Sequence, residues 1–113
     1  MLPDDTMQAI LDFRAAREWQ QFHSPQNLAV AISVEAGELL EHFQWMTTGE
    51  ARPSPTARAA LEQEVADLVI LLSYMAHDLG IDVNQAVREK LRVNAERYPV
   101  DRSRGNATKY NAL

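Results

Sequence analysis

The sequence predicts an all-α fold, and three features of the chain support this prediction. Apolar residues recur every three to four positions in four long stretches, which is the period of an amphipathic helix. The alternation of apolar and polar residues that is typical of strands is almost absent. Proline and glycine fall mainly between these stretches, where helices begin and end. Four helices in a small domain favour a bundle with antiparallel neighbours.

The first two predicted helices have clear boundary signals. The first covers about residues 6–22, and Asp5 or Thr6 can cap its N-terminus. The second begins at Ser24-Pro25, which supplies a capping hydroxyl and a proline at the first helical position. It runs to about Met46, and a loop around Gly49 and the prolines that follow it comes next.

The other two predicted helices are bounded in the same way. The third covers about residues 56–79 and ends at Gly80. Asp82-Val83-Asn84-Gln85 is a variant capping box for the fourth, which ends near Arg97. We expect a single domain over residues 1–113, with an ordered helical core over about 6–98 and a polar tail over 99–113.

Composition excludes several classes of protein. The 113 residues carry a net charge of −5, so a basic surface for duplex nucleic acid is not expected. Cysteine is absent, which excludes disulfides, thiolate metal sites and cysteine nucleophiles. Neither a secretory signal nor an apolar run long enough for a bilayer is visible. We therefore expect a soluble, cytoplasmic protein without nucleic-acid or membrane partners.

The most informative feature is that acidic residues fall on the apolar faces of two predicted helices. Glu35, Glu38 and His42 lie within the apolar stripe of the second helix, and Glu64 and Asp67 lie within that of the third. The two stripes comprise Leu28, Ala31, Ile32, Leu39, Phe43 and Met46, then Leu61, Leu68, Leu71, Leu72 and Met75. Burying carboxylates without partners is costly, and a bound cation would remove the cost.

The types of side chain indicate which cation to expect. The cluster offers oxygen ligands, with His42 as its only nitrogen, and this set favours Mg²⁺, Mn²⁺ or Ca²⁺ over zinc or copper. Mg²⁺ commonly completes its coordination with substrate phosphates, so the cluster suggests phosphate chemistry. The alternative is that both acidic pairs are ordinary solvated residues, since such pairs are common on exposed helix faces.

The spacing of the acids resembles a known metal-binding signature. Glu35-x-x-Glu38, twenty-five residues, and then Glu64-x-x-Asp67 is similar to the motif of the MazG-like all-α nucleotide pyrophosphohydrolases. The dCTP pyrophosphatase branch is the part of that superfamily that the chain resembles most. The segments that carry the resemblance are residues 19–27 (WQQFHSPQN), 35–46 (EAGELLEHFQWM), 64–67 (EVAD) and 97–110 (RYPVDRSRGNATKY).

This resemblance implies a reaction and an assembly. The expected activity is Mg²⁺-dependent hydrolysis of a nucleoside triphosphate, dCTP or a modified pyrimidine dNTP, to the monophosphate and pyrophosphate, which clears unwanted nucleotides. Mn²⁺ is a possible substitute for Mg²⁺. The expected assembly is a homotetramer built as a dimer of dimers, or a homodimer. Alternatives are a related enzyme acting on dUTP or phosphoribosyl-ATP, and a non-catalytic helical interaction module.

The resemblance also implies roles for individual residues. Glu35, Glu38, Glu64 and Asp67 match the Mg²⁺ ligands and catalytic acids, with Glu38 expected nearest the attacking water. The residues that match the substrate-binding positions are Trp19, His23, Trp45, Lys90, Asn94 and Arg97. One position departs from the pattern, because Leu71 stands where the branch has a tyrosine near the sugar.

Overall fold

The computed structural model describes residues 1–45 and 53–113, and every regular element within these residues is a helix. The prediction of an all-α fold is therefore confirmed. The chain divides into two compact units, Leu2–Leu79 and, together with Met1, Gly80–Leu113. Each unit is described by itself below, and the expectation of a single domain over residues 1–113 stays a prediction.

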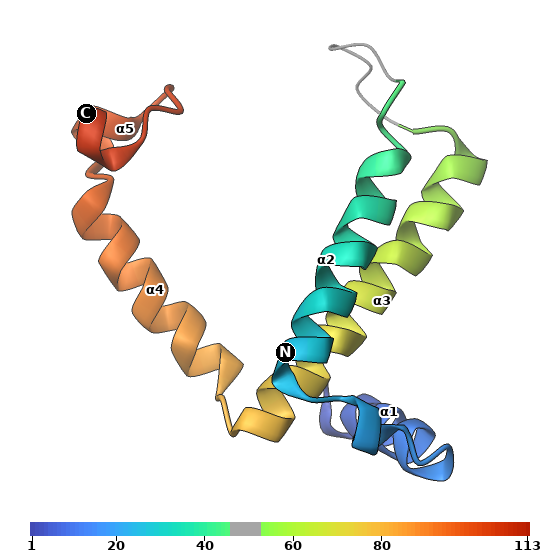
Figure 1. Ribbon diagram of the computed structural model, residues 1–113. Helices are drawn as coiled ribbons and strands as arrows, with labels where there is room; N and C mark the ends of the chain where they lie inside the picture. Colours follow the sequence, from blue (N-terminus) through green and yellow to red (C-terminus); the bar gives the residue numbers. More distant parts are fainter. Residues whose placement is uncertain (46–52) are drawn as a thin grey trace. The chain divides into compact units, whose positions relative to one another are not determined.

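The first unit is built on two antiparallel helices (Figure 1). Helix α2 (Pro25–Glu41) lies along α3 (Pro55–Leu79), and this contact is the most extensive one between elements of the chain. Helix α1 (Asp4–Ala16) packs near the C-terminal part of α3, and the 3₁₀ helix η1 (Trp19–Phe22) connects it to α2. Leu28 of α2 and Tyr74 of α3, 1% and 4% exposed, form the centre of the packed region.

The predicted helix caps at Ser24 and Asp82 are confirmed. The Ser24 hydroxyl oxygen accepts a hydrogen bond from the Asn27 amide at 3.1 Å. The Asp82 carboxylate accepts one from the Gln85 amide, also at 3.1 Å. Each cap satisfies an amide that has no partner within the first turn of its helix.

The prediction for the first helix is wrong at both ends. Helix α1 ends at Ala16, because Glu18 adopts a left-handed backbone conformation with φ of 53° and the chain then continues as η1. The expected caps Asp5 and Thr6 lie inside the helix. Pro3 occupies the capping position without a side-chain hydrogen bond, while Asp4 and Asp5 place negative charge at the positive end of the helix dipole.

The second helix is also shorter than predicted. Helix α2 ends at Glu41, and residues 42–45 form turns in which the Phe43 amide bonds to the Leu40 carbonyl. The predicted end at Met46 and the loop glycine Gly49 lie outside the described residues. Helix α3 begins at Pro55, one residue before the predicted start.

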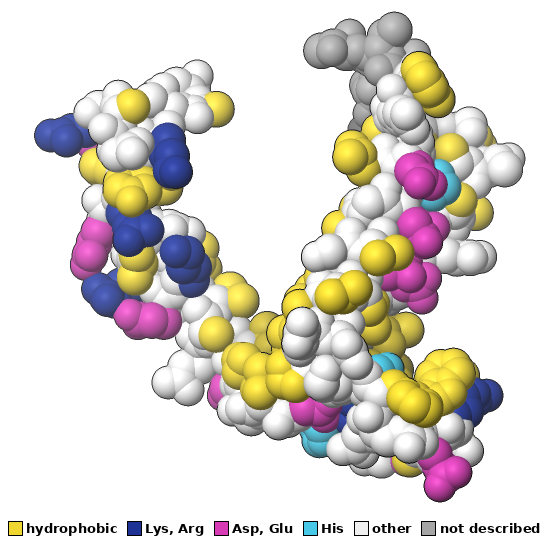
Figure 2. Space-filling model, in the orientation of Figure 1, with side chains coloured by type: hydrophobic (Ala, Val, Ile, Leu, Met, Phe, Trp, Pro, Cys, Tyr) yellow, Lys and Arg dark blue, Asp and Glu magenta, His cyan; other side chains and the backbone are white. Residues whose placement is uncertain are grey.

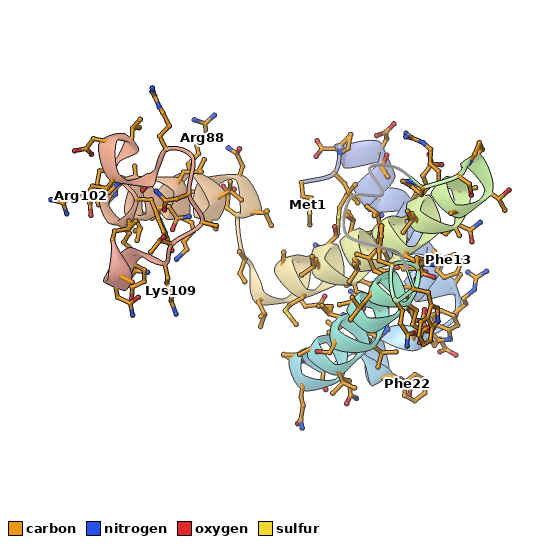
Figure 3. All side chains as sticks on the ribbon, turned by 90° about the horizontal axis from the view of Figure 1, so that it is seen from above. Met1, Phe13, Phe22, Arg88, Arg102 and Lys109 are labelled. Carbon is orange, nitrogen blue, oxygen red and sulfur yellow. The ribbon has the colours of Figure 1, made fainter. Side chains whose placement is uncertain are left out.

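The second unit consists of α4 (Val83–Arg97), the short α5 (Val100–Ser103) and the 3₁₀ helix η2 (Tyr110–Ala112). The expected polar tail over residues 99–113 contains α5 and η2. The Arg97 guanidinium lies 4.7 Å from the centre of the Tyr110 ring, and the Tyr98 and Tyr110 rings meet edge to face at 6.1 Å. The basic side chains labelled in Figure 3 for this unit, Arg88, Arg102 and Lys109, project outward.

A buried ion pair joins α1 to the C-terminal end of α3. The Arg14 guanidinium, 2% exposed, donates from Nη1 to Asp78 Oδ2 at 2.8 Å and from Nη2 to Asp78 Oδ1 at 2.7 Å. These hydrogen bonds hold the pKa of Asp78 below its usual value. The guanidinium also lies 4.4 Å from the centre of the Tyr74 ring, whose hydroxyl donates to the Ile10 carbonyl.

In residues 1–45 and 53–113, no helix has both the length and the apolar character that crossing a membrane requires.

Removing one member of the ion pair should destabilise the first unit strongly. We expect Arg14→Met to lower the free energy of unfolding by about 3 kcal/mol, because it leaves the Asp78 carboxylate, whose side chain is 18% exposed, charged and without its partner. The double variant Arg14→Met/Asp78→Leu should lose much less, since it removes both charges together. Urea unfolding at pH 7 measures both values, and equal losses in the two variants would contradict the role of the pair.

The same pair gives the stability a defined pH dependence. The pKa of Asp78 is lowered in the folded protein, so its contribution is present above the pKa of an unfolded aspartate, about 3.9. It is lost as the pH falls through the lower pKa of the folded state. The difference between the wild type and Arg14→Met should therefore shrink below about pH 4.

Candidate metal centre and ligand pocket

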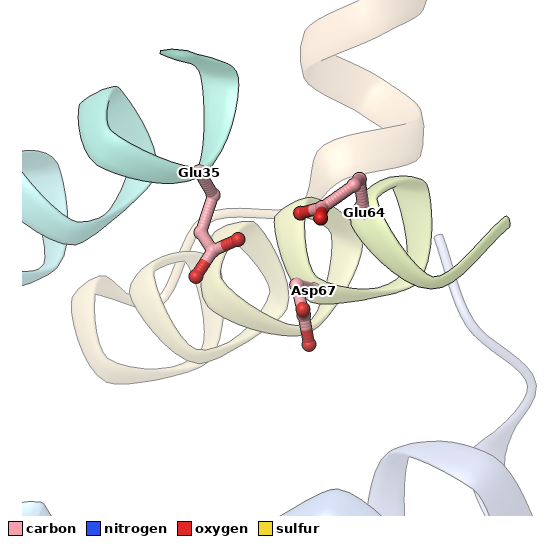
Figure 4. Close-up of side chains that lie close together, drawn as sticks. All are labelled: Glu35, Glu64 and Asp67. Atoms are coloured by element: carbon pink, nitrogen blue, oxygen red, sulfur yellow. The ribbon is translucent and has the colours of Figure 1, made fainter. Parts of the chain in front are cut away.

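Three carboxylates converge between α2 and α3 (Figure 4). Glu35 comes from α2, Glu64 and Asp67 come from α3, and one oxygen of each lies within 4.8 Å of the others. Glu64 and Asp67 are three residues apart, so they occupy one face of α3. Oε2 of Glu35 and Oε2 of Glu64 are buried and have no hydrogen-bond partner among the described residues. The structure thus brings together three of the four predicted ligands.

The fourth predicted acid, Glu38, lies one helical turn beyond Glu35 on α2. Burial and then the neighbouring carboxylates, that of Glu38 first, raise the pKa of Glu35 to about 7. Glu64 and Asp67 contribute to the same rise. Glu38 therefore belongs to the same group of interacting acids, although it is not one of the three whose oxygens converge.

Within the described part of the chain, no lysine or arginine forms an ion pair with these acids. His42 is the basic group nearest to them, with Nε2 at 3.6 Å from Oε1 of Glu64. Figure 2 shows acidic side chains gathered over the α2–α3 pair, whereas the lysines and arginines of the second unit gather over α4 and the tail. Oxygen ligands with buried, unpartnered atoms fit a hard divalent cation such as Mg²⁺ or Mn²⁺.

An apolar pocket opens beside the carboxylates within the first unit. Its volume is about 550 Å³, and Trp19 and His23 line it, as the resemblance implies. The complete lining comprises Ala9, Ile10, Phe13, Trp19, His23, Glu35, Asp67, Ile70, Leu71 and Tyr74. Two of the converging acids are therefore also walls of the pocket, so a ligand held there meets them directly.

The aromatic wall depends on the turn between α1 and η1. The left-handed Glu18 reverses the chain, and the Trp19 ring meets the Phe13 ring edge to face with 5.6 Å between their centres. The Arg17 guanidinium covers the Phe13 ring at 3.6 Å. The turn that ends the first helix early is thus what brings Trp19 to the pocket.

The remaining predicted substrate-binding residues are not part of this lining. Trp45 lies in the turns that follow α2, and its side chain is 87% exposed. Lys90, Asn94 and Arg97 lie on α4 in the second unit, where Asn94 is half-buried and the other two are exposed. Their assignment to the substrate stays a prediction.

Except for Leu71, which the resemblance places near the sugar, several lining residues on α3 and α1 were not singled out from the sequence as ligand contacts. Ile70, Leu71 and Tyr74 follow Asp67 by three, four and seven residues, which places all of them on the face of α3 that carries the acids. That spacing was available in the sequence. Phe13 and the Arg14–Asp78 pair depend on the docking of α1, which no local pattern reveals.

Comparisons with known proteins agree on a single family. The model of the MazG-like family matches residues 30–113. The chain is 43% identical to dCTP pyrophosphatase 1 of Mus musculus, over 98% of this chain and 69% of that protein. It is 44% identical to the protein of the same name of Bos taurus, over 97% of this chain and 67% of that protein. The crystal structure of a pyrophosphatase from Archaeoglobus fulgidus superposes with a TM-score of 0.77 at 33% identity, covering 85% of this chain and 91% of that one.

Together with the helical fold, these matches define the class of the protein as an all-helical enzyme. The chain belongs to the MazG-like family. The resemblance stated from the sequence is thereby confirmed, as is the expectation of an enzyme over that of a non-catalytic interaction module.

Cation binding should depend on pH because Glu35 holds a proton that the cation must displace. With the pKa of Glu35 at about 7, the apparent affinity for Mg²⁺ or Mn²⁺ should fall by up to about tenfold per pH unit below 7 and level off above it. Calorimetric titration at pH 6, 7 and 8 measures this. Glu35→Gln should abolish the binding, whereas Glu62→Gln, at an exposed acid of α3, should not.

The raised pKa also gives the sign of the effect on stability. The folded state holds this proton more tightly than the unfolded state does, so the metal-free protein loses stability as the pH rises from about 4.3, the pKa of an unfolded glutamate, through about 7. A cation should therefore raise the melting temperature more at pH 8 than at pH 6. Equal shifts at the two pH values would contradict the assignment.

Proposed function

We propose that this chain hydrolyses a nucleoside triphosphate, preferably dCTP or a modified pyrimidine dNTP, to the monophosphate and pyrophosphate with Mg²⁺ as cofactor. The observation that carries the proposal is the convergence of Glu35, Glu64 and Asp67 beside a pocket with apolar and aromatic walls. The names of the relatives, dCTP pyrophosphatase 1 and a pyrophosphatase, support the same reaction.

The order of side chains along α3 suits a nucleotide. The acids of the cluster, Glu64 and Asp67, come first along the helix. They are followed by the pocket-lining residues Ile70, Leu71 and Tyr74. Seven residues separate Asp67 from Tyr74, which is roughly 10 Å at the α-helical rise. A triphosphate at the acidic end would therefore leave the sugar and base among the apolar and aromatic side chains.

The proposed ligands of Mg²⁺ are Glu35, Glu38, Glu64 and Asp67. The buried, unpartnered oxygens of Glu35 and Glu64 support this assignment. When bound, Mg²⁺ supplies charge neutralisation for the triphosphate and withdraws electron density from the phosphorus under attack. His42, with Nε2 at 3.6 Å from Oε1 of Glu64, would orient that carboxylate.

The remaining chemistry belongs to the side chains of the chain itself. Glu38 lies outside the three converging oxygens. Because a carboxylate has two oxygens, Glu38 would accept a proton from the attacking water in addition to binding Mg²⁺, while the bond from phosphorus to pyrophosphate breaks. The apolar walls, including Ile70 and Leu71, would exclude other water and hold the substrate in one orientation, which supplies much of the rate in such reactions.

The base and sugar would be held by the remaining predicted contacts. Trp19 and His23 lie in the pocket wall, and the proposal adds Trp45, Lys90, Asn94 and Arg97 as further nucleotide contacts. Leu71 offers an aliphatic surface in the same wall, which contributes no hydrogen bond to the sugar. Deoxyribose selectivity would then depend on shape more than on a polar contact.

The test is pyrophosphate release from each common dNTP and NTP, 5-substituted dCTP analogues, dUTP and phosphoribosyl-ATP, with Mg²⁺ and with EDTA. We expect Mg²⁺-dependent release, strongest with dCTP or a 5-substituted analogue. Glu38→Ala and Asp67→Ala should each lower the rate by at least about a hundredfold, because each removes a group that acts on the developing charge. Their helix content, measured by circular dichroism, should remain.

Glu62→Gln is the matched control, since Glu62 lies on α3 with a side chain that is 67% exposed and pairs only with Arg58 among the described residues. It should keep the wild-type rate. Release from another nucleotide would retain the reaction and replace the substrate. No release from a folded, Mg²⁺-saturated protein, or full activity in both alanine variants, would contradict the proposal.

We also propose that α2 forms an interface between copies of this chain, as expected for a dimer or a dimer of dimers. Val30, Val34 and Leu40 are 58%, 55% and 68% exposed on α2. Ser33 and Gly37 lie between them, and a Cβ added at Gly37 would meet nothing within 4 Å. The Ser33 hydroxyl donates to the Ala29 carbonyl, so this face can be buried without an unsatisfied hydroxyl.

Charge placed on this face should break the assembly. We expect wild-type protein to sediment as a dimer or tetramer, and Val34→Glu to sediment at a smaller mass, because a carboxylate cannot be buried against an apolar face without a partner. Gln63→Glu adds the same charge at an exposed position of α3 and should leave the mass unchanged. A wild-type monomer at all concentrations would exclude the interface.

A further inference from the structure

The Arg14–Asp78 pair lies directly behind one wall of the pocket. Arg14 is 2% exposed and is held on two sides, by both carboxylate oxygens of Asp78 at 2.7 and 2.8 Å and by the Tyr74 ring at 4.4 Å. A guanidinium fixed in this way has little freedom to rotate, because the two parallel hydrogen bonds set its plane as well as its position.

The same guanidinium reaches the pocket histidine. Nη1 of Arg14 lies 3.4 Å from Nδ1 of His23, and His23 lines the pocket. Arginine carries hydrogen-bond donors and no acceptor, and it stays protonated at all relevant pH values. Nδ1 of His23 must therefore be the nitrogen with the free lone pair, and the hydrogen of the neutral ring must sit on Nε2.

The groups around His23 agree with a neutral ring. Burial first, and then the positive charge of Arg14, lower the pKa of His23, against a smaller opposing effect of Asp78. The Tyr74 ring packs against the imidazole with 5.4 Å between the ring centres. Glu35 and Asp67 line the same pocket and are the other charged side chains among its lining residues.

We propose that Arg14, held by Asp78, is a positioning residue that fixes His23 as the Nε2–H tautomer, so that this wall offers a hydrogen-bond donor to an acceptor atom of the bound base. The inference rests on the proposed function, because it assigns the pocket beside the acids to a nucleotide. The base atoms that could accept this hydrogen bond from His23 are a carbonyl oxygen and an unprotonated ring nitrogen.

A fixed donor gives the pocket selectivity that a free histidine would not. Among the ten lining residues, only Trp19 and His23 have a side-chain N–H, and the Tyr74 hydroxyl already donates to the Ile10 carbonyl. An imidazole free to exchange tautomers could serve a donor or an acceptor equally. When Arg14 fixes the tautomer, the His23 imidazole can only donate. A base with a donor at this point would then have no hydrogen-bond partner, and a buried unpaired polar group is costly.

The tautomer can be read directly by nitrogen NMR. The chain has three histidines, so long-range ¹H–¹⁵N correlation of ¹⁵N-histidine-labelled protein gives three ring patterns, and His23→Gln identifies that of His23. We expect the Nε2–H pattern for His23 in the wild type. The Nδ1–H pattern, or a mixture of the two, would overturn the proposal without any variant of Arg14.

Two variants then test whether Arg14 is the cause. Arg14→Met/Asp78→Leu removes both charges, keeps a similar volume and is expected to stay folded, and His23 should become a mixture of tautomers. Arg14→Lys keeps a cationic donor and should retain the wild-type pattern. A single Nε2–H tautomer in the double variant would show that another group holds the ring, and would overturn the role of Arg14.

Kinetics separate this role from a purely structural one. For the nucleotide with the highest kcat/KM, the double variant should raise KM on the order of tenfold, the equivalent of one lost hydrogen bond, with kcat within about twofold. A merely less stable protein would lose kcat at constant KM. An unchanged KM would overturn the proposed hydrogen bond from His23 to the bound base. Absence of turnover in the wild type would instead overturn the proposed function, and the NMR result would then decide on the tautomer.

Discussion

Acidic side chains directed into the contact between two packed helices constrain the whole first unit. Glu35, Glu64 and Asp67 bring their oxygens within 4.8 Å of one another. Asp67 is exposed, whereas Glu35 and Glu64 are half-buried where ordinary helix packing would place apolar groups. Removing carboxylates from water is unfavourable, and their mutual repulsion adds to the cost. The proton that Glu35 retains up to about pH 7 is one answer to this cost, and a divalent cation is the other.

The α2–α3 pair therefore needs its stability from other contacts. Leu28 and Tyr74 supply the most buried apolar contacts of the described residues, and the Arg14–Asp78 pair ties α1 to α3. Asp78 follows Asp67 by eleven residues, roughly 16 Å along the helix. The stabilising ion pair and the destabilising acids therefore lie at different positions along α3.

The sequence predicts those parts of the molecule that depend on local chemistry. Ser24 and Asp82 cap helices as expected because the hydroxyl or carboxylate acts on an amide three residues away. Three of the four acids on the apolar stripes, Glu35, Glu64 and Asp67, converge, because helical periodicity places them on the faces through which α2 and α3 pack. The family pattern adds Trp19 and His23, which do lie in the pocket.

What the sequence does not predict depends on contacts between distant segments. No glycine or proline marks the left-handed Glu18, so the first helix appears in the sequence to continue to Phe22. Arg14 and Asp78 are sixty-four residues apart, and neither stands out in its own helix. Trp45 lies in the turns after α2 and is 87% exposed, and its assignment as a base contact stays a prediction.

One face of α3 therefore carries several functions in sequence: acids at 64 and 67, apolar walls at 70 and 71, an aromatic ring at 74 and an ion-pair partner at 78. Steps of three and four residues keep these side chains on one side while moving each about one turn further along the helix. The acidic end and the Tyr74–Asp78 end are roughly 10–16 Å apart, a separation at which substitutions without shared partners usually act independently. Changes at Tyr74, or at His23 which packs against its ring, can therefore alter which ligand is accepted while the carboxylates keep their chemistry.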